Sequence, residues 1–313
     1  MSWLFYLYAA ILGLILGSFF NVAIYRLPRN ETLGQRSRCP GCGAPIHWYD
    51  NIPLVSFIVL RGRCRSCGTR ISWRYPLVEL TTALLFVLVY WWSITIVPGD
   101  LHIPGGAHFV PEVLIGILLV SILIIAKGAD ITSGIVPNRA MYPGLVLMLL
   151  LVTALALYRG QPGRIGLAVA TGAIGGGFLL VAGLIYGALF MRRAPATVSE
   201  TDDMALSEGA VPERVEEIEG EEDEGLPTGI GMGDVKLAAF FGMALGYFHL
   251  DLIVVALFLG FLVGALGSLF FILFSGKGRK DRLPFAPFLA TGALLALIWG
   301  QRLVDAYIRL VRH

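Results

Sequence analysis

The sequence predicts an all-α protein that crosses a membrane with about eight helices and carries a small cytoplasmic module with four cysteines. Three observations predict this class. Of the 313 residues, 56% are hydrophobic and only 15% are charged, with a mean hydropathy of +0.74, whereas a soluble domain has about 25% charged residues. Apolar runs of about 20 residues, the length that crosses a hydrocarbon core of about 30 Å, recur along the chain. All four cysteines lie between the first two of these runs.

The predicted spans follow the apolar runs in order. They cover residues 4–25, 77–97, 112–128, 140–158, 165–190, 233–249, 252–274 and 285–304. The first run has neither a basic segment before it nor a small-residue cleavage site, so we expect a retained span rather than a signal peptide. Glycine clusters such as GAIGGG at 172–177, and small residues through 256–268, predict helices that pack closely against one another.

The basic residues indicate the orientation. Eighteen Lys and Arg residues lie in the connections of one side, against five on the other side. Those connections are 26–76, 127–139, 191–232 and 275–284. Because Lys-rich and Arg-rich loops stay in the cytoplasm, we expect this side to be cytoplasmic and both termini to lie outside. We expect a lipid bilayer around the helices and no nucleic-acid partner.

Segment 195–229 contains 12 of the 22 carboxylates and only one basic residue. Such a composition predicts a disordered cytoplasmic loop, which either solubilises this side of the protein or attracts a basic segment of a substrate. The chain therefore divides into five parts. They are a first transmembrane helix (1–25), a zinc-binding loop (26–76), helices two to five (77–190), the acidic loop (191–230) and helices six to eight (231–313).

The cysteines form two C-x-x-C pairs, Cys39–Cys42 and Cys64–Cys67, with 21 residues between them. This spacing predicts a structural zinc site, since four thiolates close the coordination sphere and leave no position for an activated water. Two disulfides are the alternative, which a reducing cytoplasm disfavours. His47 is close in sequence, but with four cysteines available we expect it not to bind the metal.

Asp130 and Asp234 both border predicted spans. A carboxylate at the edge of hydrocarbon is costly, which makes it a candidate functional residue. Each has a structural alternative, because Asp130 could form a turn and Asp234 could cap a helix. The predicted topology places both at the cytoplasmic border on different helices, with Lys236 nearby. Two such acids suit amide hydrolysis: one takes a proton from water while the other, protonated, polarises the scissile carbonyl.

Three other positions belong to the candidate site. Gly231 and Gly233 would let a substrate strand pass close to the backbone, since no side chain stands in its way. Glu79 is a third acid at the cytoplasmic border, either favoured there by a helix dipole or in contact with substrate. Asn21 inside the first span needs a hydrogen-bond partner, and we expect a neighbouring helix to supply it.

With these motifs in order, the chain resembles the type IV prepilin peptidases, membrane aspartic proteases with a GxGD motif. The matching segments are GSFFNV at 17–22, RLP at 26–28, the cysteine loop with WYDNIP at 48–53 and LRGRC at 60–64, RYP at 74–76, Glu79, Asp130 with Pro137, GMGDVKLAA at 231–239 and PFAPF at 284–288. The chain differs from the family pattern at Asn138, where Asp is common, at Ala286, where Gly is common, and in the length of the acidic insertion.

The resemblance implies that Asp130 and Asp234 are the catalytic pair. The substrates would be prepilins and pseudopilins, cut after a Gly at the end of a short basic leader on the cytoplasmic side of the bacterial inner membrane. Members with the cysteine loop commonly also methylate the new N-terminus with S-adenosylmethionine. Three alternatives stay open at this point: a transporter with the two acids as a proton relay, a zinc-organised methyltransferase without protease activity, and a membrane scaffold.

Overall fold

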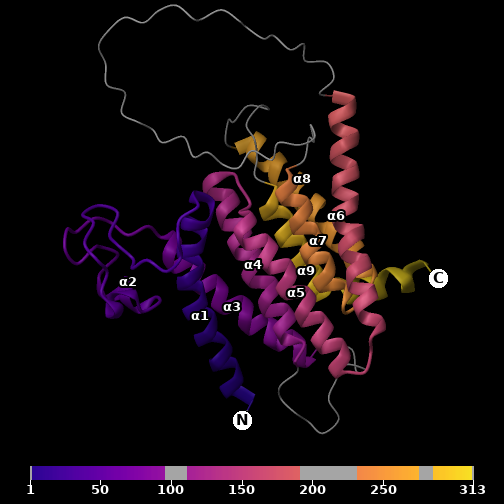
Figure 1. The fold of residues 1–313 in the computed structure, drawn as a ribbon, viewed down its shortest axis with the longest axis horizontal. Coiled ribbons are helices and arrows are strands. Elements are labelled where there is room, and N and C mark those ends of the chain that lie inside the picture. Colours follow the sequence, from indigo (N-terminus) through magenta and orange to yellow (C-terminus); the bar gives the residue numbers. More distant parts are fainter. Residues whose placement is uncertain (1, 96–110, 191–230, 275–284, 312–313) are drawn as a thin grey trace, which may run out of the picture.

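The computed structural model describes residues 2–95, 111–190, 231–274 and 285–311, which form long α-helices and, between the first two of these, the cysteine loop (Figure 1). The long helices are α1 (Ser2–Arg26), α3 (Arg74–Thr95), α4 (Val113–Ser133), α5 (Asn138–Tyr158), α6 (Gly163–Phe190), α7 (Met232–Gly246), α8 (Asp251–Phe274) and α9 (Ala286–Val311). Each corresponds to one predicted span. The cysteine loop adds three short helices, η1 (Leu27–Arg29), η2 (Trp48–Asn51) and α2 (Val55–Val59). The predicted acidic loop and connection 275–284 lie outside the described residues.

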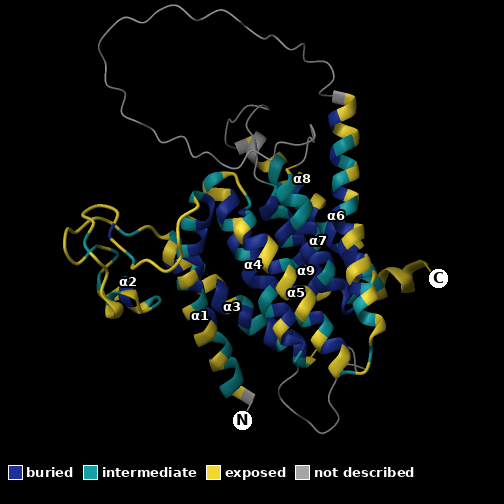
Figure 2. Cartoon of the chain, viewed as in Figure 1, coloured by how far each residue is buried: buried dark blue, intermediate teal, exposed yellow. Residues whose placement is uncertain are grey.

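The surface of the helix bundle is apolar, as in a protein that crosses a membrane many times. Seven of the described helices are long and apolar enough to span a bilayer. Figure 2 colours many residues in the interior of the bundle as buried. Large apolar residues such as Val146, Phe258 and Leu266 are exposed. Lipid tails can cover this exterior, which water would not favour.

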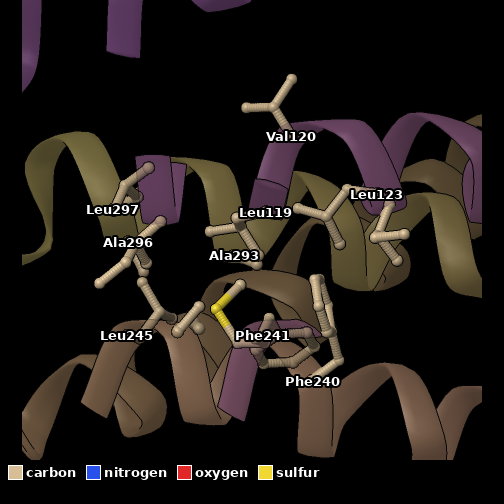
Figure 3. Packing of buried hydrophobic residues seen from close by; sticks show 14 of the residues in the cluster. Leu119, Val120, Leu123, Phe240, Phe241, Leu245, Ala293, Ala296 and Leu297 are labelled. Carbon is tan, nitrogen blue, oxygen red and sulfur yellow. The ribbon is translucent and has the colours of Figure 1, made fainter. Parts of the chain in front are cut away.

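Helix α7 is the exception in length, because it has only 15 residues. It packs against α4, α5, α6, α8 and α9 and lies in the interior of the bundle. Its side chains Phe240 and Phe241 are fully buried, and Figure 3 shows them facing Leu119 and Leu123 of α4 and Ala293 of α9. A helix surrounded by protein need not match the bilayer thickness by itself, so α7 can be shorter than its neighbours.

Glycines allow the close helix contacts that the sequence predicts. A Cβ at Gly175 of α6 would lie 2.8 Å from the carbonyl oxygen of Ala238 of α7, and a Cβ at Gly172 would lie 3.0 Å from that of Ala239. On α1, a Cβ at Gly17 would lie 2.8 Å from the Cα of Glu79 in α3. The GAIGGG segment therefore brings α6 against α7, as expected of small residues in membrane helices.

A fully buried acid that hydropathy did not single out lies at the N-terminus of α4. Glu112 has no exposed surface, and both its oxygens accept hydrogen bonds from the Arg159 guanidinium, at 2.8 and 2.7 Å. The Tyr247 hydroxyl, just after α7, lies 3.4 Å from Glu112 Oε1. This ion pair joins the N-terminal end of α4 to the C-terminal ends of α5 and α7.

Breaking this pair should destabilise the fold. We expect Arg159→Met to cost about 3–5 kcal/mol, because it leaves the buried Glu112 carboxylate without its counter-charge. The measurement is thermal unfolding in detergent, with Arg302→Met on the exposed end of α9 as the matched control. The double variant Glu112→Gln/Arg159→Met should recover part of the loss. An unfolding midpoint equal to that of the native protein would show that the pair adds nothing.

Candidate active site

Asp130 lies in the last turn of α4, which continues to Ser133 and is therefore longer than the predicted span. The helix ends at Gly134, whose positive φ of 68° suits glycine and whose N–H donates to the carbonyl oxygen of Asp130. The Asp130 residue is 8% exposed, and its Oδ2 accepts a hydrogen bond of 3.1 Å from the backbone N–H of Ala286. The carboxylate thus belongs to a helix and not to a turn, which corrects the turn alternative.

Asp234 lies in the first turn of α7. The cap position is Gly231, without a side-chain cap, so the alternative that Asp234 caps the helix is wrong. The Asp234 carboxylate is partly buried and close enough to that of Asp130 for a direct electrostatic interaction. Asp130 thus lies at the C-terminal end of α4 and Asp234 at the N-terminal end of α7. These two helix ends lie toward the top of Figure 1. The structure therefore brings together the two acids that the sequence predicts as a pair.

The two glycines before Asp234 differ in their surroundings. A Cβ at Gly233 would lie 2.7 Å from the Cβ of Val136, which follows the end of α4. At Gly231 the nearest atom to such a Cβ is Asp234 Oδ2, at 3.7 Å, which is ordinary contact. Gly233 thus allows α7 to approach the α4–α5 connection, a packing role that the sequence did not predict, whereas Gly231 has open space beside it.

This difference predicts that alanine substitutions at Gly233 and Gly231 have unequal effects on activity. We expect Gly233→Ala to lower kcat by about 10- to 100-fold, because a shift of α7 away from Val136 misplaces Asp234. Gly231→Ala should cost less, and Val136→Gly should restore activity to the Gly233→Ala protein by removing the clashing atom. Rates of amide hydrolysis at saturating substrate, the chemistry expected of the acid pair, measure all three variants. A Gly233→Ala defect that Val136→Gly does not relieve would instead indicate a direct role of Gly233 with substrate.

Lys236 contacts the beginning of α5. Its Nζ donates to Asn138 Oδ1 at 2.8 Å and lies 5.0 Å from the centre of the Tyr142 ring. Asn138 is also where the chain departs from the resembled family, and the carboxylate common there would accept the same hydrogen bond. Lys236 thus joins α7 to α5, and this contact supports the position of Asp234 two residues earlier.

The segment PFAPF contributes a backbone hydrogen-bond donor to the candidate site, which the sequence did not indicate. Ala286 is the first residue of α9, and its N–H is one of the groups that a helix start leaves free to bind a carboxylate. Because the contact to Asp130 uses the main chain, Ala at this position preserves it as Gly would. Pro287, in the first turn, is a signal that could have indicated this helix start.

Glu79 and Asn21 connect helices around the cysteine module. Glu79 is buried, and its Oε2 accepts a hydrogen bond of 2.8 Å from the backbone N–H of Leu54. It lies beyond the first turn of α3, so the helix-dipole alternative does not describe it. Asn21 donates to the carbonyl oxygen of Tyr75 at 3.1 Å, which is the predicted bond between helices.

The four cysteines converge on one point. Their sulfur atoms all lie within 4.8 Å of one another, and the cysteines are free of disulfides. The two pairs have the same backbone turn, in which Gly43 donates to Cys39 and Gly68 donates to Cys64, with φ of 70° and 71° at the two glycines. Both turns need the left-handed conformation that glycine adopts at little cost.

This arrangement fits zinc. A tetrahedral ion with Zn–S bonds of about 2.3 Å places sulfur atoms about 3.8 Å apart, and Cys39 Sγ lies 3.8 Å from Cys67 Sγ. The hydrogen bond with the Thr69 hydroxyl lowers the pKa of the Cys67 thiol to about 6. His47 does not join the cluster, and its ring stacks on Tyr49.

An ion pair holds the second cysteine pair against the WYDN segment. Asp50 accepts hydrogen bonds from Arg65, the closest at 2.6 Å between Oδ1 and Nη2. This hydrogen bond keeps the pKa of the Asp50 carboxyl below its usual value. The segment between the two cysteine pairs is thereby joined to the residue that follows Cys64.

The fold and site define a class, a polytopic helical membrane protein with two carboxylates together at one end of the bundle and a four-thiol module beside it. Two family models match this chain: the bacterial peptidase A24 N-terminal domain over residues 11–93 and the type IV leader peptidase family over residues 117–276. The chain belongs to the type IV leader peptidase family, and it is therefore an enzyme of a peptidase family.

Relatives match the chain over almost its whole length. A prepilin leader peptidase/N-methyltransferase of Aeromonas salmonicida is 28% identical, with 98% of this chain and 95% of the relative covered. A protein of the same name from Bacillus subtilis is 29% identical over 96% of both chains. That of Myxococcus xanthus is 38% identical over 53% of this chain and 46% of its own. No solved structure matches the chain significantly.

Proposed function

We propose that this enzyme is a membrane aspartic endopeptidase that removes the short basic leader from type IV prepilins and pseudopilins. Asp130 and Asp234 are its catalytic pair. The observation that carries the proposal is the approach of these two acids, which come from helices far apart in the sequence to one end of the bundle. The names of the relatives support the substrate class.

The chemistry follows from the pair. Two carboxylates that share a site cannot easily both be ionised, so together they hold one proton. The ionised member takes a proton from water as the water attacks the scissile carbonyl carbon, and the protonated member donates a hydrogen bond to the carbonyl oxygen. The N–H of Ala286 holds Asp130 in place, while Lys236, through Asn138, holds the helix that carries Asp234.

We propose a second activity, N-methylation of the newly formed N-terminus with S-adenosylmethionine, which supplies the methyl group. The relatives are named for both activities. Zinc in the cysteine module has a structural role, because its four thiolate ligands leave no open coordination position. We infer that the leader-cleavage site and the module lie on the cytoplasmic side of the inner membrane, with both termini outside, and the positive-inside distribution of Lys and Arg supports this orientation.

The test is one assay with two readouts. The detergent-purified protein is incubated with a prepilin, with and without S-adenosylmethionine, and the product is analysed by mass spectrometry. Leader loss in both samples, with one added methyl group only when the cofactor is present, is the expected result. Absence of cleavage by zinc-loaded protein of intact fold would contradict the proposal, and a proton flux coupled to solute uptake would favour the transporter alternative.

A further inference from the structure

The cysteine module carries a short helix with a strained start. Leu54, immediately before α2, has φ 58° and ψ −45°, and the Val55 N–H donates to the Pro53 carbonyl at 2.6 Å. This is a γ-turn with positive φ at its centre, which is rare and costly for a residue with a side chain. In this conformation the Leu54 N–H donates to Glu79 Oε2. A buried carboxylate of α3 therefore holds α2.

The hydrogen bond to Glu79 fixes the depth of α2. Glu79 is the sixth residue of α3, a helix long and apolar enough to cross a membrane. With a rise of 1.5 Å per residue, it lies about 7–8 Å along the helix axis from Arg74. The beginning of α2 is therefore beside the span and not beyond its end. Figure 1 shows the module at the flank of the bundle, within the extent of α1.

The exposed side of α2 is apolar. Val55, Ile58 and Val59 have the spacing i, i+3, i+4 and share one side of the helix. All three are exposed, Ile58 at 73% and Val59 at 67%. The same region is drawn mostly as exposed in Figure 2. In a module that faced only water, this surface would be unfavourable.

Trp73 connects α2 to the lipid-facing side of α3. It is 70% exposed, and its ring centre lies 4.8 Å from that of Phe57 in α2. Its carbonyl oxygen accepts a hydrogen bond from the Leu77 N–H, so Trp73 continues the turn of α3. The exposed residues Trp73, Leu77, Leu80 and Leu84 follow helical spacing along one stripe. The apolar surface is thus continuous from the outer face of the span to α2.

The charge of the module matches a membrane surface. Loop 26–76 has nine Arg residues against two acids, Glu31 and Asp50, a net charge of +7 (9 − 2). Asp50 is already paired with Arg65. A positive net charge in a segment that also exposes an apolar face is typical of segments that lie in the interface of anionic membranes, and Trp is enriched at that depth.

We propose that α2 and Trp73 insert into the boundary between headgroups and acyl chains in the leaflet around α3, with anionic phospholipid as their partner. Glu79 sets the depth of this insertion by holding Leu54. The cysteine module is then bound to the bilayer surface at a fixed depth beside α1 and α3. The proposal does not depend on the proposed peptidase activity.

Photocrosslinking of the full chain tests the insertion. The protein is placed in nanodiscs of equal parts phosphatidylethanolamine and phosphatidylglycerol, with benzoylphenylalanine at position 58 or, as a control, at the exposed polar position 66 between two cysteines. We expect phospholipid adducts several-fold more often at 58 than at 66. Equal yields at the two positions, or adducts at 58 to a second protein chain, would overturn the proposal.

Two further measurements test the depth and the charge. In the same nanodiscs, Ile58→Asp/Val59→Asp should speed amide hydrogen exchange over residues 52–60 while the zinc content stays native. Unchanged exchange would contradict insertion. Replacing phosphatidylglycerol by phosphatidylcholine should lower the adduct yield at position 58 several-fold, and an equal yield would exclude anionic lipid as the partner.

Discussion

Asp130→Asn and Asp234→Asn are each expected to abolish leader removal while substrate binding persists. Asn has nearly the shape of Asp and can still accept the hydrogen bond that Asp130 receives from Ala286. It cannot take up or supply the proton that the reaction needs. General acid–base catalysis by one group contributes about 100- to 10,000-fold, so the loss in kcat should be of that order or larger. Because the two acids act as a unit, the double variant should be no slower than either single one.

The control for these variants is Asp305→Asn, an exposed acid near the end of α9. It makes the same chemical change and should leave the cleavage rate as in the native protein. Single-turnover cleavage of a prepilin measures the rate, and a fluorescently labelled prepilin measures binding. Cleavage that survives either change at Asp130 or Asp234 would rule out the pair as the catalytic groups.

Asp234→Glu extends the same argument to geometry. The added methylene keeps the acid but moves the carboxylate by about 1 Å, which is enough to cost on the order of 100-fold. The first turn of α7 is held on one side by the contact of Gly233 with Val136 and on another by Lys236 with Asn138. This support leaves little freedom for the helix to compensate. A rate for Asp234→Glu close to the native one would mean that the site tolerates a displaced acid.

The spans could be predicted from the sequence because the length of an apolar run sets the length of a helix in hydrocarbon. The residues at which the helices end were less predictable. Helix α4 continues through KGADITS to Ser133, since hydrogen bonding does not stop where hydrophobicity stops. For the same reason the sequence left open a turn at Asp130 as an alternative. Helix α7 ends at Gly246, earlier than predicted. The predicted span also included Tyr247, Phe248 and His249, which follow the helix.

Contacts between distant segments were beyond a single sequence. The predicted topology allowed Asp130 and Asp234 to meet without requiring it, and the hydrogen bond from the Ala286 N–H to Asp130 depends on how α9 packs against α4. Glu112 was overlooked because it stands at the edge of an apolar run, next to Pro111, where an acid is ordinary. Its burial depends on Arg159, which lies in another connection. Residues that support the site through such contacts have no local pattern of their own.

Loss of zinc is expected to separate the two proposed activities. Cys39→Ser/Cys67→Ser should leave the purified protein without the roughly one zinc per chain expected of the native enzyme. Zinc binding to such sites is worth about 10–16 kcal/mol at neutral pH, far more than the few short helices of this loop can supply by packing. The module should then unfold, and N-methylation should be lost. Leader removal should persist, because Asp130, Asp234 and Ala286 lie on α4, α7 and α9.

Elemental analysis measures the zinc, limited proteolysis reports on the folding of residues 26–76, and mass spectrometry follows both activities. The matched control is Ser66→Ala, which changes an exposed residue between two ligands and should keep zinc and both activities. A native protein that contains no metal would defeat the zinc assignment. Cleavage that falls in parallel with methylation would mean that the module also positions the prepilin. One module would then hold the prepilin for cleavage and, afterwards, the new N-terminus for methylation.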